Sequence, residues 1–133
     1  MKFSLWMHGT LAAALFAASP LLFAAEDPSP QHVKWMKDAG ELSGKIRKGV
    51  EVEASAKQLG VIYKELEGFW AKRSETGAKA TKEGQTTAAT LAKAAAAGDA
   101  AGIAAASKVL GGTCRTCHDT HREKISDTEY KIR

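Results

Sequence analysis

The sequence predicts an all-α domain built as an antiparallel four-helix bundle. Beyond about residue 30, apolar residues recur at helical spacing almost throughout the chain. No alternating run of β-branched residues is long enough to indicate a sheet. Four helical segments are separated by short turns, and short connections favour antiparallel neighbours in a bundle.

The N-terminal 25 residues are typical of a secretory signal peptide. Lys2 precedes an apolar run that ends in the small residues Ala24 and Ala25. Ser19 and Pro20 interrupt this run, which is also too short to span a bilayer comfortably. We therefore expect cleavage rather than stable membrane insertion, and an exported, periplasmic bacterial protein. Residues 26–133, 108 in number, then form a single domain with one core.

The first two helices have the clearest pattern. The first covers about 30–49, where Gly49 can end it, and the second covers about 51–72. Each places apolar residues on one face. These residues are Val33, Met36, Ala39, Leu42 or Ser43, and Ile46 in the first helix, and Val52, Ala56, Leu59, Ile62, Tyr63, Leu66, Phe69 and Trp70 in the second.

The second half of the domain is rich in alanine. A third helix covers about 74–97 and ends before Gly98, and Asp99 can cap a fourth. The fourth directs Ile103, Ala106, Val109 and Leu110 toward the core. Because Ala88–Ala106 offers few large apolar side chains, we expect room there for a buried group, with a loosely packed bundle as the alternative. Residues 126–133 are expected to fray.

The charge pattern disfavours a nucleic-acid partner. The formal net charge of the whole chain is +4, and without Lys2 there are 18 basic and 15 acidic residues, which leaves +3. Lysine and arginine alternate with glutamate and aspartate along the chain, as is usual for solvated helix surfaces. We expect no nucleic acid to bind.

The motif that carries chemistry is Cys114-Arg115-Thr116-Cys117-His118, which contains the only two cysteines. This spacing is that of c-type haem attachment. Two thiols add to the two vinyl groups at one porphyrin edge, and the adjacent imidazole reaches the iron. The motif therefore predicts one covalent haem c, bound through Cys114 and Cys117 with His118 as an axial ligand. A disulfide, a redox pair and half of a zinc site are the alternatives.

The ligand on the opposite side of the iron must come from elsewhere in the chain. Met36 is the only methionine after the signal peptide, and its thioether is a suitable ligand. His32 lies one turn earlier and is the rival, although the ragged start of a helix favours contact with a propionate or solvent. His121 follows His118 by three residues, so we expect it to be a surface or packing residue. If neither Met36 nor His32 coordinates, the iron stays five-coordinate.

A haem motif near the C-terminus of an exported four-helix chain resembles the class II c-type cytochromes, the cytochrome c prime family and its methionine-ligated relatives. The segment from Gly112 to Lys124 is similar to the closing helix of that family. The resemblance implies that Arg122 lies beside the proximal face of the haem. Met36-Lys37-Asp38-Ala39-Gly40 is similar to the start of the low-spin branch, in which a first-helix methionine completes the coordination.

Two functions follow from these expectations. With His118 and Met36 as ligands, the protein transfers electrons to and from redox partner proteins whose identity the sequence does not reveal, and it is not an enzyme. With an open position, it binds nitric oxide or carbon monoxide as high-spin relatives do. The resemblance also implies a possible homodimer through the first two helices, for which Trp35, Tyr63 or Phe69 are candidate contacts, although each is equally well explained as core.

Overall fold

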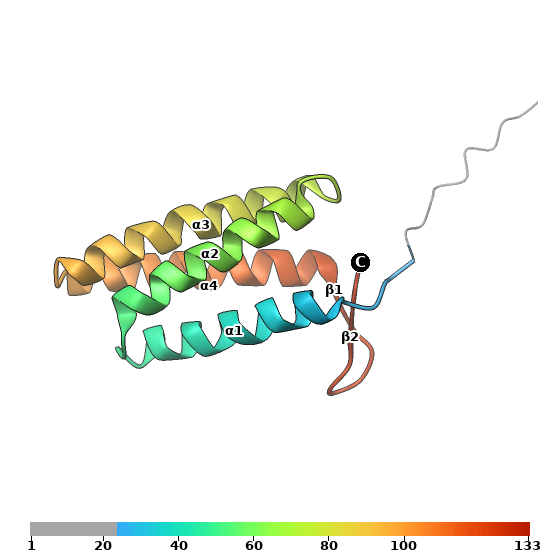
Figure 1. Cartoon of the computed structure of the whole chain (residues 1–133), viewed down its shortest axis with the longest axis horizontal. Coiled ribbons are helices and arrows are strands. Elements are labelled where there is room, and N and C mark those ends of the chain that lie inside the picture. The colour runs from blue at the N-terminus through green and yellow to red at the C-terminus, as the bar shows by residue number, and fades with distance from the viewer. Residues whose placement is uncertain (1–23) are drawn as a thin grey trace, which may run out of the picture.

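The computed structural model describes residues 24–133, and these form four long helices and a short hairpin (Figure 1). The elements are α1 (Pro30–Arg47), α2 (Val52–Trp70), α3 (Glu75–Ala96), α4 (Ala100–His121), β1 (Arg122–Lys124) and β2 (Tyr130–Ile132). The predicted four-helix fold is confirmed, and the bounds expected for the first three helices agree to within two residues. The predicted signal peptide lies almost wholly outside the described residues.

The turns between helices follow the expected chemistry. Gly49 and Gly98 both adopt positive φ, at 69° and 66°, just after α1 and α3. Only glycine takes this conformation without a steric cost, so both helices end where the sequence indicated. The side chain of Asp99 accepts a hydrogen bond of 2.9 Å from the amide of Gly102 and caps α4 as predicted.

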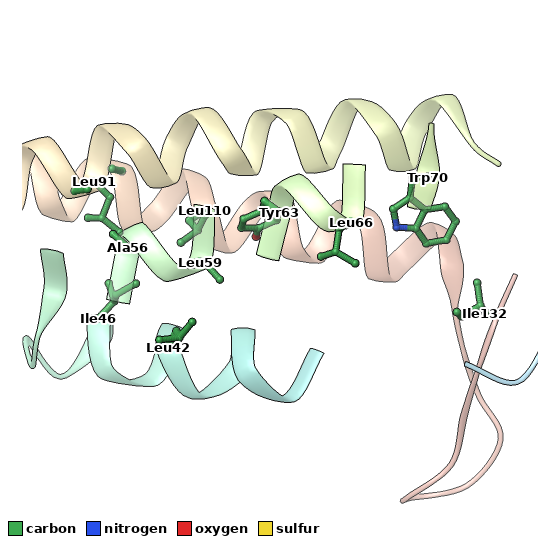
Figure 2. Packing of buried hydrophobic residues seen from close by; sticks show 12 residues of the cluster. Leu42, Ile46, Ala56, Leu59, Tyr63, Leu66, Trp70, Leu91, Leu110 and Ile132 are labelled. Atoms are coloured by element: carbon green, nitrogen blue, oxygen red, sulfur yellow. The ribbon is translucent and has the colours of Figure 1, made fainter. Parts of the chain in front are cut away.

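The helices pack in chain order, with α1 against α2, α2 against α3 and α3 against α4. Figure 2 shows the buried side chains that join them. This core contains Leu42, Ile46, Ala56, Leu59, Tyr63, Leu66, Trp70, Leu91, Ala92, Ala106, Leu110 and Ile132.

Two valines expected in the core are exposed instead. Val33 is 51% exposed and Val109 is 46% exposed. In α1 the buried positions are His32, Leu42 and Ile46, and the interval of fourteen residues from His32 to Ile46 is two heptads. A stripe with this period passes through His32 and leaves Val33 outside the core.

The alanine-rich segment is closely packed, contrary to the expectation of room there. Ala88 and Leu91 have no exposed surface, and Ala92 and Ala106 are buried. A Cβ atom at Gly60 of α2 would lie at an ordinary contact distance, 3.8 Å, from the Cβ of Ala88. Small side chains have let the helix backbones approach one another rather than leave a void between them.

The chain after α4 is ordered as a hairpin, so the expectation that residues 126–133 fray was wrong. Arg122 pairs with Ile132, and Lys124 with Tyr130. Glu26 and Ile132 exchange two backbone hydrogen bonds of 2.8 Å, which adds the N-terminal segment to the edge of the hairpin. Ile132 is buried, so apolar packing supplements these few hydrogen bonds. Among residues 24–133, no helix is both long enough and apolar enough for a bilayer crossing.

Candidate functional site

A cavity of about 880 Å³ lies between α1, α2 and α4, with the hairpin at one end. Its volume falls within the range of about 300–1,000 Å³ that is usual for cofactor sites. The walls are largely apolar and include Ile62, Leu66, Trp70, Leu110 and Ile132. All five residues predicted for the site line this one cavity, namely Met36, Cys114, Cys117, His118 and Arg122.

Helix α4 brings the motif residues together near its C-terminal end. Cys117 and His118 follow Cys114 by three and four residues, so both lie on the same face of the helix as Cys114. Both thiols are free and half-buried. Burial, and then the neighbouring Cys114, raise the pKa of Cys117 to about 11. Its thiol is therefore protonated at neutral pH.

The imidazole of His118 is prepared for a neutral role. His118 is exposed as a whole residue, but partial desolvation of its ring lowers its pKa below the ordinary value of 6.5. The positive charge of Arg122 lowers the pKa further, while Asp119 opposes this shift. A histidine binds a metal through a neutral ring nitrogen, so a depressed pKa keeps that nitrogen available at lower pH. Arg122 also lies against Tyr130 of the hairpin, with its guanidinium carbon 3.5 Å from the ring centroid.

Met36 faces the same cavity from α1. It is half-buried and packs against the core, and it is the only methionine among the described residues. The cavity places this thioether on a helix facing α4, which carries His118.

His32 is not at a ragged helix end, as the sequence suggested, but buried at 7% exposure. Ser29 caps α1 ahead of it, and its ring lies 4.8 Å from that of Phe69 and 6.0 Å from that of Trp35. Burial, followed by the charges of Arg73 and His118, lowers its pKa. Its Nδ1 atom is buried without a hydrogen-bond partner, and the residue lines the cavity.

His121 is a packing residue, as expected. Its ring stacks on Trp70 at a centroid distance of 4.3 Å and an interplanar angle of 25°. Nδ1 lies 3.0 Å from the backbone oxygen atom of Arg133, which only accepts, so Nδ1 carries the hydrogen. Nε2 lies 2.8 Å from the hydroxyl oxygen of Ser74. Both nitrogens are thus engaged within the protein.

Tyr63 is a site residue that the sequence analysis did not identify. The sequence is compatible with Tyr63 as a core residue or as a dimer contact. The residue is only 6% exposed inside the bundle, so it has no surface for a partner subunit. Its hydroxyl oxygen lies 3.2 Å from Cys114 Sγ. One signal was available, because a buried tyrosine hydroxyl needs a hydrogen-bond partner, but the partner is 51 residues away in the chain.

The cavity fits a haem. It combines apolar walls, two thiols and an imidazole on one helix face, and a thioether on the facing helix. A structural zinc site needs four ligands. Within residues 24–133, no three histidine, cysteine, aspartate or glutamate side chains are grouped as a metal site.

Comparisons with known proteins agree with this arrangement. A family model described as cytochrome c' matches residues 36–122, from the methionine in α1 to the end of α4. A cytochrome c' of Pararhodospirillum photometricum is 48% identical over 54 residues. That alignment spans 41% of this chain and 42% of the relative, so it covers less than half of either protein. No solved structure gives a significant match.

Proposed function

Because the chain belongs to the cytochrome c' family, whose members carry haem c, we propose that it is an exported monohaem electron-transfer protein with His118 and Met36 as the iron ligands. The observation that carries this proposal is that Met36 lines the cavity that His118 also lines. When bound, the haem supplies one-electron chemistry between ferrous and ferric iron.

The chain contributes the residues that attach the haem, a ligand on each side of the iron and apolar surroundings. Cys114 and Cys117 hold the porphyrin edge through thioether bonds. His118 supplies a neutral imidazole nitrogen whose availability is favoured by partial desolvation and by Arg122. Leu66, Leu110 and their apolar neighbours give the cavity largely apolar walls. Ligands that are held by packed helices move little when the charge on the iron changes, and this favours rapid electron transfer.

Methionine ligation also has a consequence for the reduction potential. A thioether is a soft, neutral ligand and raises the potential relative to ligation by two histidines. Because Met36 sits in the middle of α1 and packs against the core, its position is defined by the helix rather than by a loop. The protein would therefore accept electrons from donors of lower potential and pass them to a partner of higher potential.

The second candidate is the binding of nitric oxide or carbon monoxide at a five-coordinate iron. The cavity wall beside Met36 is made of small residues, since Ala39, Gly40 and Ser43 of α1 also line it. If the thioether does not reach the iron, these residues leave space for a diatomic ligand. The match to the cytochrome c' family model points in the same direction.

Visible spectra of the purified holoprotein distinguish the two functions. The proposal predicts a low-spin ferric spectrum with the weak far-red sulfur-to-iron band, and a ferrous spectrum that carbon monoxide does not change. A high-spin spectrum that shifts at once with carbon monoxide would replace electron transfer by gas binding.

Two substitutions at Met36 assign the ligand. Met36→Leu keeps the apolar volume and removes the sulfur, so it should give a high-spin haem that binds carbon monoxide, as should Met36→Ala. Lys37→Ala is the matched control, because Lys37 is exposed on the same helix, does not line the cavity and should leave the low-spin spectrum intact. A low-spin spectrum in both Met36 variants would exclude this ligand, and loss of the spectrum in His32→Ala alone would identify His32 instead.

The proposed location of the protein is the periplasm. Export to the periplasm follows from the residues that resemble a signal peptide and from haem attachment, which takes place beyond the cytoplasmic membrane. Fractionation of a bacterium that expresses the full chain should recover the haem protein in the periplasm, shortened at its N-terminus. Recovery of an unshortened haem-free chain inside the cell would contradict export.

A further inference from the structure

The hydroxyl group of Tyr63 is aimed at one of the two attachment cysteines. Its oxygen lies 3.2 Å from Cys114 Sγ, within the range of a hydrogen bond to sulfur, and both residues line the cavity. The two side chains come from different helices, α2 and α4. Figure 2 shows Tyr63 among the buried side chains of the core, with its oxygen in red.

The tyrosine ring is held in place, so its hydroxyl is a fixed point. An added Cβ atom at Gly84 of α3 would lie 2.6 Å from Tyr63 Cδ1, which shows that the ring rests directly on that backbone. Burial, followed by the charge of Cys114 and the hydrogen bond to it, raises the pKa of Tyr63 well above its ordinary value. The hydroxyl therefore keeps its proton at any physiological pH.

Cys117 lacks such a partner. In the described part of the chain, its thiol makes no hydrogen bond to another side chain, although its sulfur is also half-buried at the cavity. The two cysteines of the motif therefore differ in one respect that the motif itself does not reveal. A hydrogen bond to a fixed hydroxyl favours one rotamer of Cys114, and Cys117 has no equivalent restraint.

We propose that Tyr63 is a positioning residue for haem attachment, which orients the sulfur of Cys114 toward the cavity and remains hydrogen-bonded to it afterwards. This inference rests on the proposed haem attachment at Cys114 and Cys117.

The attachment step is balanced without any further reactant. The Cys114 S–H bond and the π bond of a vinyl group break, a C–S bond forms at the inner vinyl carbon, and the hydrogen goes to the outer one. No electrons are gained or lost overall. Either atom of the Tyr63–Cys114 pair can donate before the reaction, but a thioether has no hydrogen. Tyr63 must then be the donor, with sulfur as a weak acceptor.

The test measures covalent haem per chain in two backgrounds that each retain one cysteine. In Cys117→Ala only Cys114 can react, and in Cys114→Ala only Cys117 can. Tyr63→Phe is made in both backgrounds and in the wild-type chain, and all proteins are expressed in a host that performs periplasmic haem attachment. Mass spectrometry of the denatured chains gives the fraction with haem, and peptide mapping after alkylation shows which cysteine remains free.

Tyr63→Phe should lower attachment at Cys114 roughly two- to tenfold, the effect of one ordinary hydrogen bond, and should leave attachment at Cys117 unchanged. In the wild-type background it should increase the fraction of chains in which Cys114 alone is free. An equal loss in both backgrounds would mean that Tyr63 acts only through folding, and no loss in either would also overturn the proposal. If the wild-type chain itself carries no covalent haem, the proposed function fails and not this inference alone.

Discussion

The ring of Tyr63 on α2 rests on the backbone of Gly84 on α3, where any side chain would collide with it. The same relationship recurs one heptad away, where Gly77 faces the ring of Trp70 and an added Cβ atom would lie 2.6 Å from Trp70 Cδ2. These two glycines let the aromatic residues of α2 lie flat against α3. The hydroxyl of Tyr63 and the ring of Trp70 are thereby placed at the cavity.

Gly84→Ala should destabilise the protein although alanine is the better helix former. The new methyl group would displace the ring of Tyr63, and overpacking of this kind outweighs the helix preference, so we expect a net loss of about 1–2 kcal/mol. Gly68→Ala is the matched control, because no atom lies within 4 Å of its added Cβ, and it should stabilise the helix by up to about 1 kcal/mol. Denaturant unfolding measures both. Equal stability of the two variants would show that the ring can move at no cost.

His32→Phe should reduce the loss of stability in acid. Burial lowers the pKa of His32 below 6.5, so the unfolded chain takes up a proton at this residue before the folded protein does. The stability that depends on neutral His32 is therefore complete above pH 6.5 and is lost as the pH falls through the lower pKa of the folded state. Phenylalanine retains the aromatic packing and removes the titration.

The free energy of unfolding is compared at about pH 7.5 and about pH 5. The wild-type protein should lose more stability than His32→Phe over this interval, by at most about 2 kcal/mol, the limit set by about 1.36 kcal/mol for each pH unit below 6.5. The same pH dependence in both proteins would mean that His32 titrates alike in the folded and unfolded chains.

Ile132→Ala should loosen the end of the cavity. Ile132 is buried in the hairpin and its backbone pairs with Glu26, so removal of its side chain should cost about 2 kcal/mol and speed hydrogen exchange at both amides. Ile125→Ala, in the same hairpin but 48% exposed, should change stability by less than about 0.5 kcal/mol. Unchanged exchange in Ile132→Ala would show that the hairpin does not depend on this contact.

Replacement of both attachment cysteines should separate covalent binding from the fold. In Cys114→Ala with Cys117→Ala, we expect acid solvent to extract the haem, because only ligation and packing hold it. Thr116→Ala is the control, since Thr116 is exposed between the cysteines and its hydroxyl bonds the carbonyl of Gly112 on its own helix. That variant should retain its haem. Haem that resists extraction in the double variant would show attachment at another residue.

The family model match confirms the resemblance to the cytochrome c' family that the sequence indicated. The methionine-ligated branch stays a prediction that the spectra must test. The motif alone was sufficient to indicate the cofactor, because two thiols and an adjacent imidazole at this spacing are typical of c-type haem attachment. The distal ligand could not be decided in the same way, since His32 and Met36 share one face of α1 and both line the cavity.

Local signals determined what depends on neighbours in the chain. Helical spacing, together with Gly49, Gly98 and Asp99, indicated the number of helices and several of their ends, because periodicity and capping involve residues only a few positions apart. The tertiary structure decided what depends on distant segments. It placed the cavity outside the alanine-rich segment Ala88–Ala106, buried His32, ordered the hairpin against Glu26 and brought Tyr63 to Cys114. These contacts join segments that are far apart in the sequence, and only the packing of whole helices against one another brings such segments together.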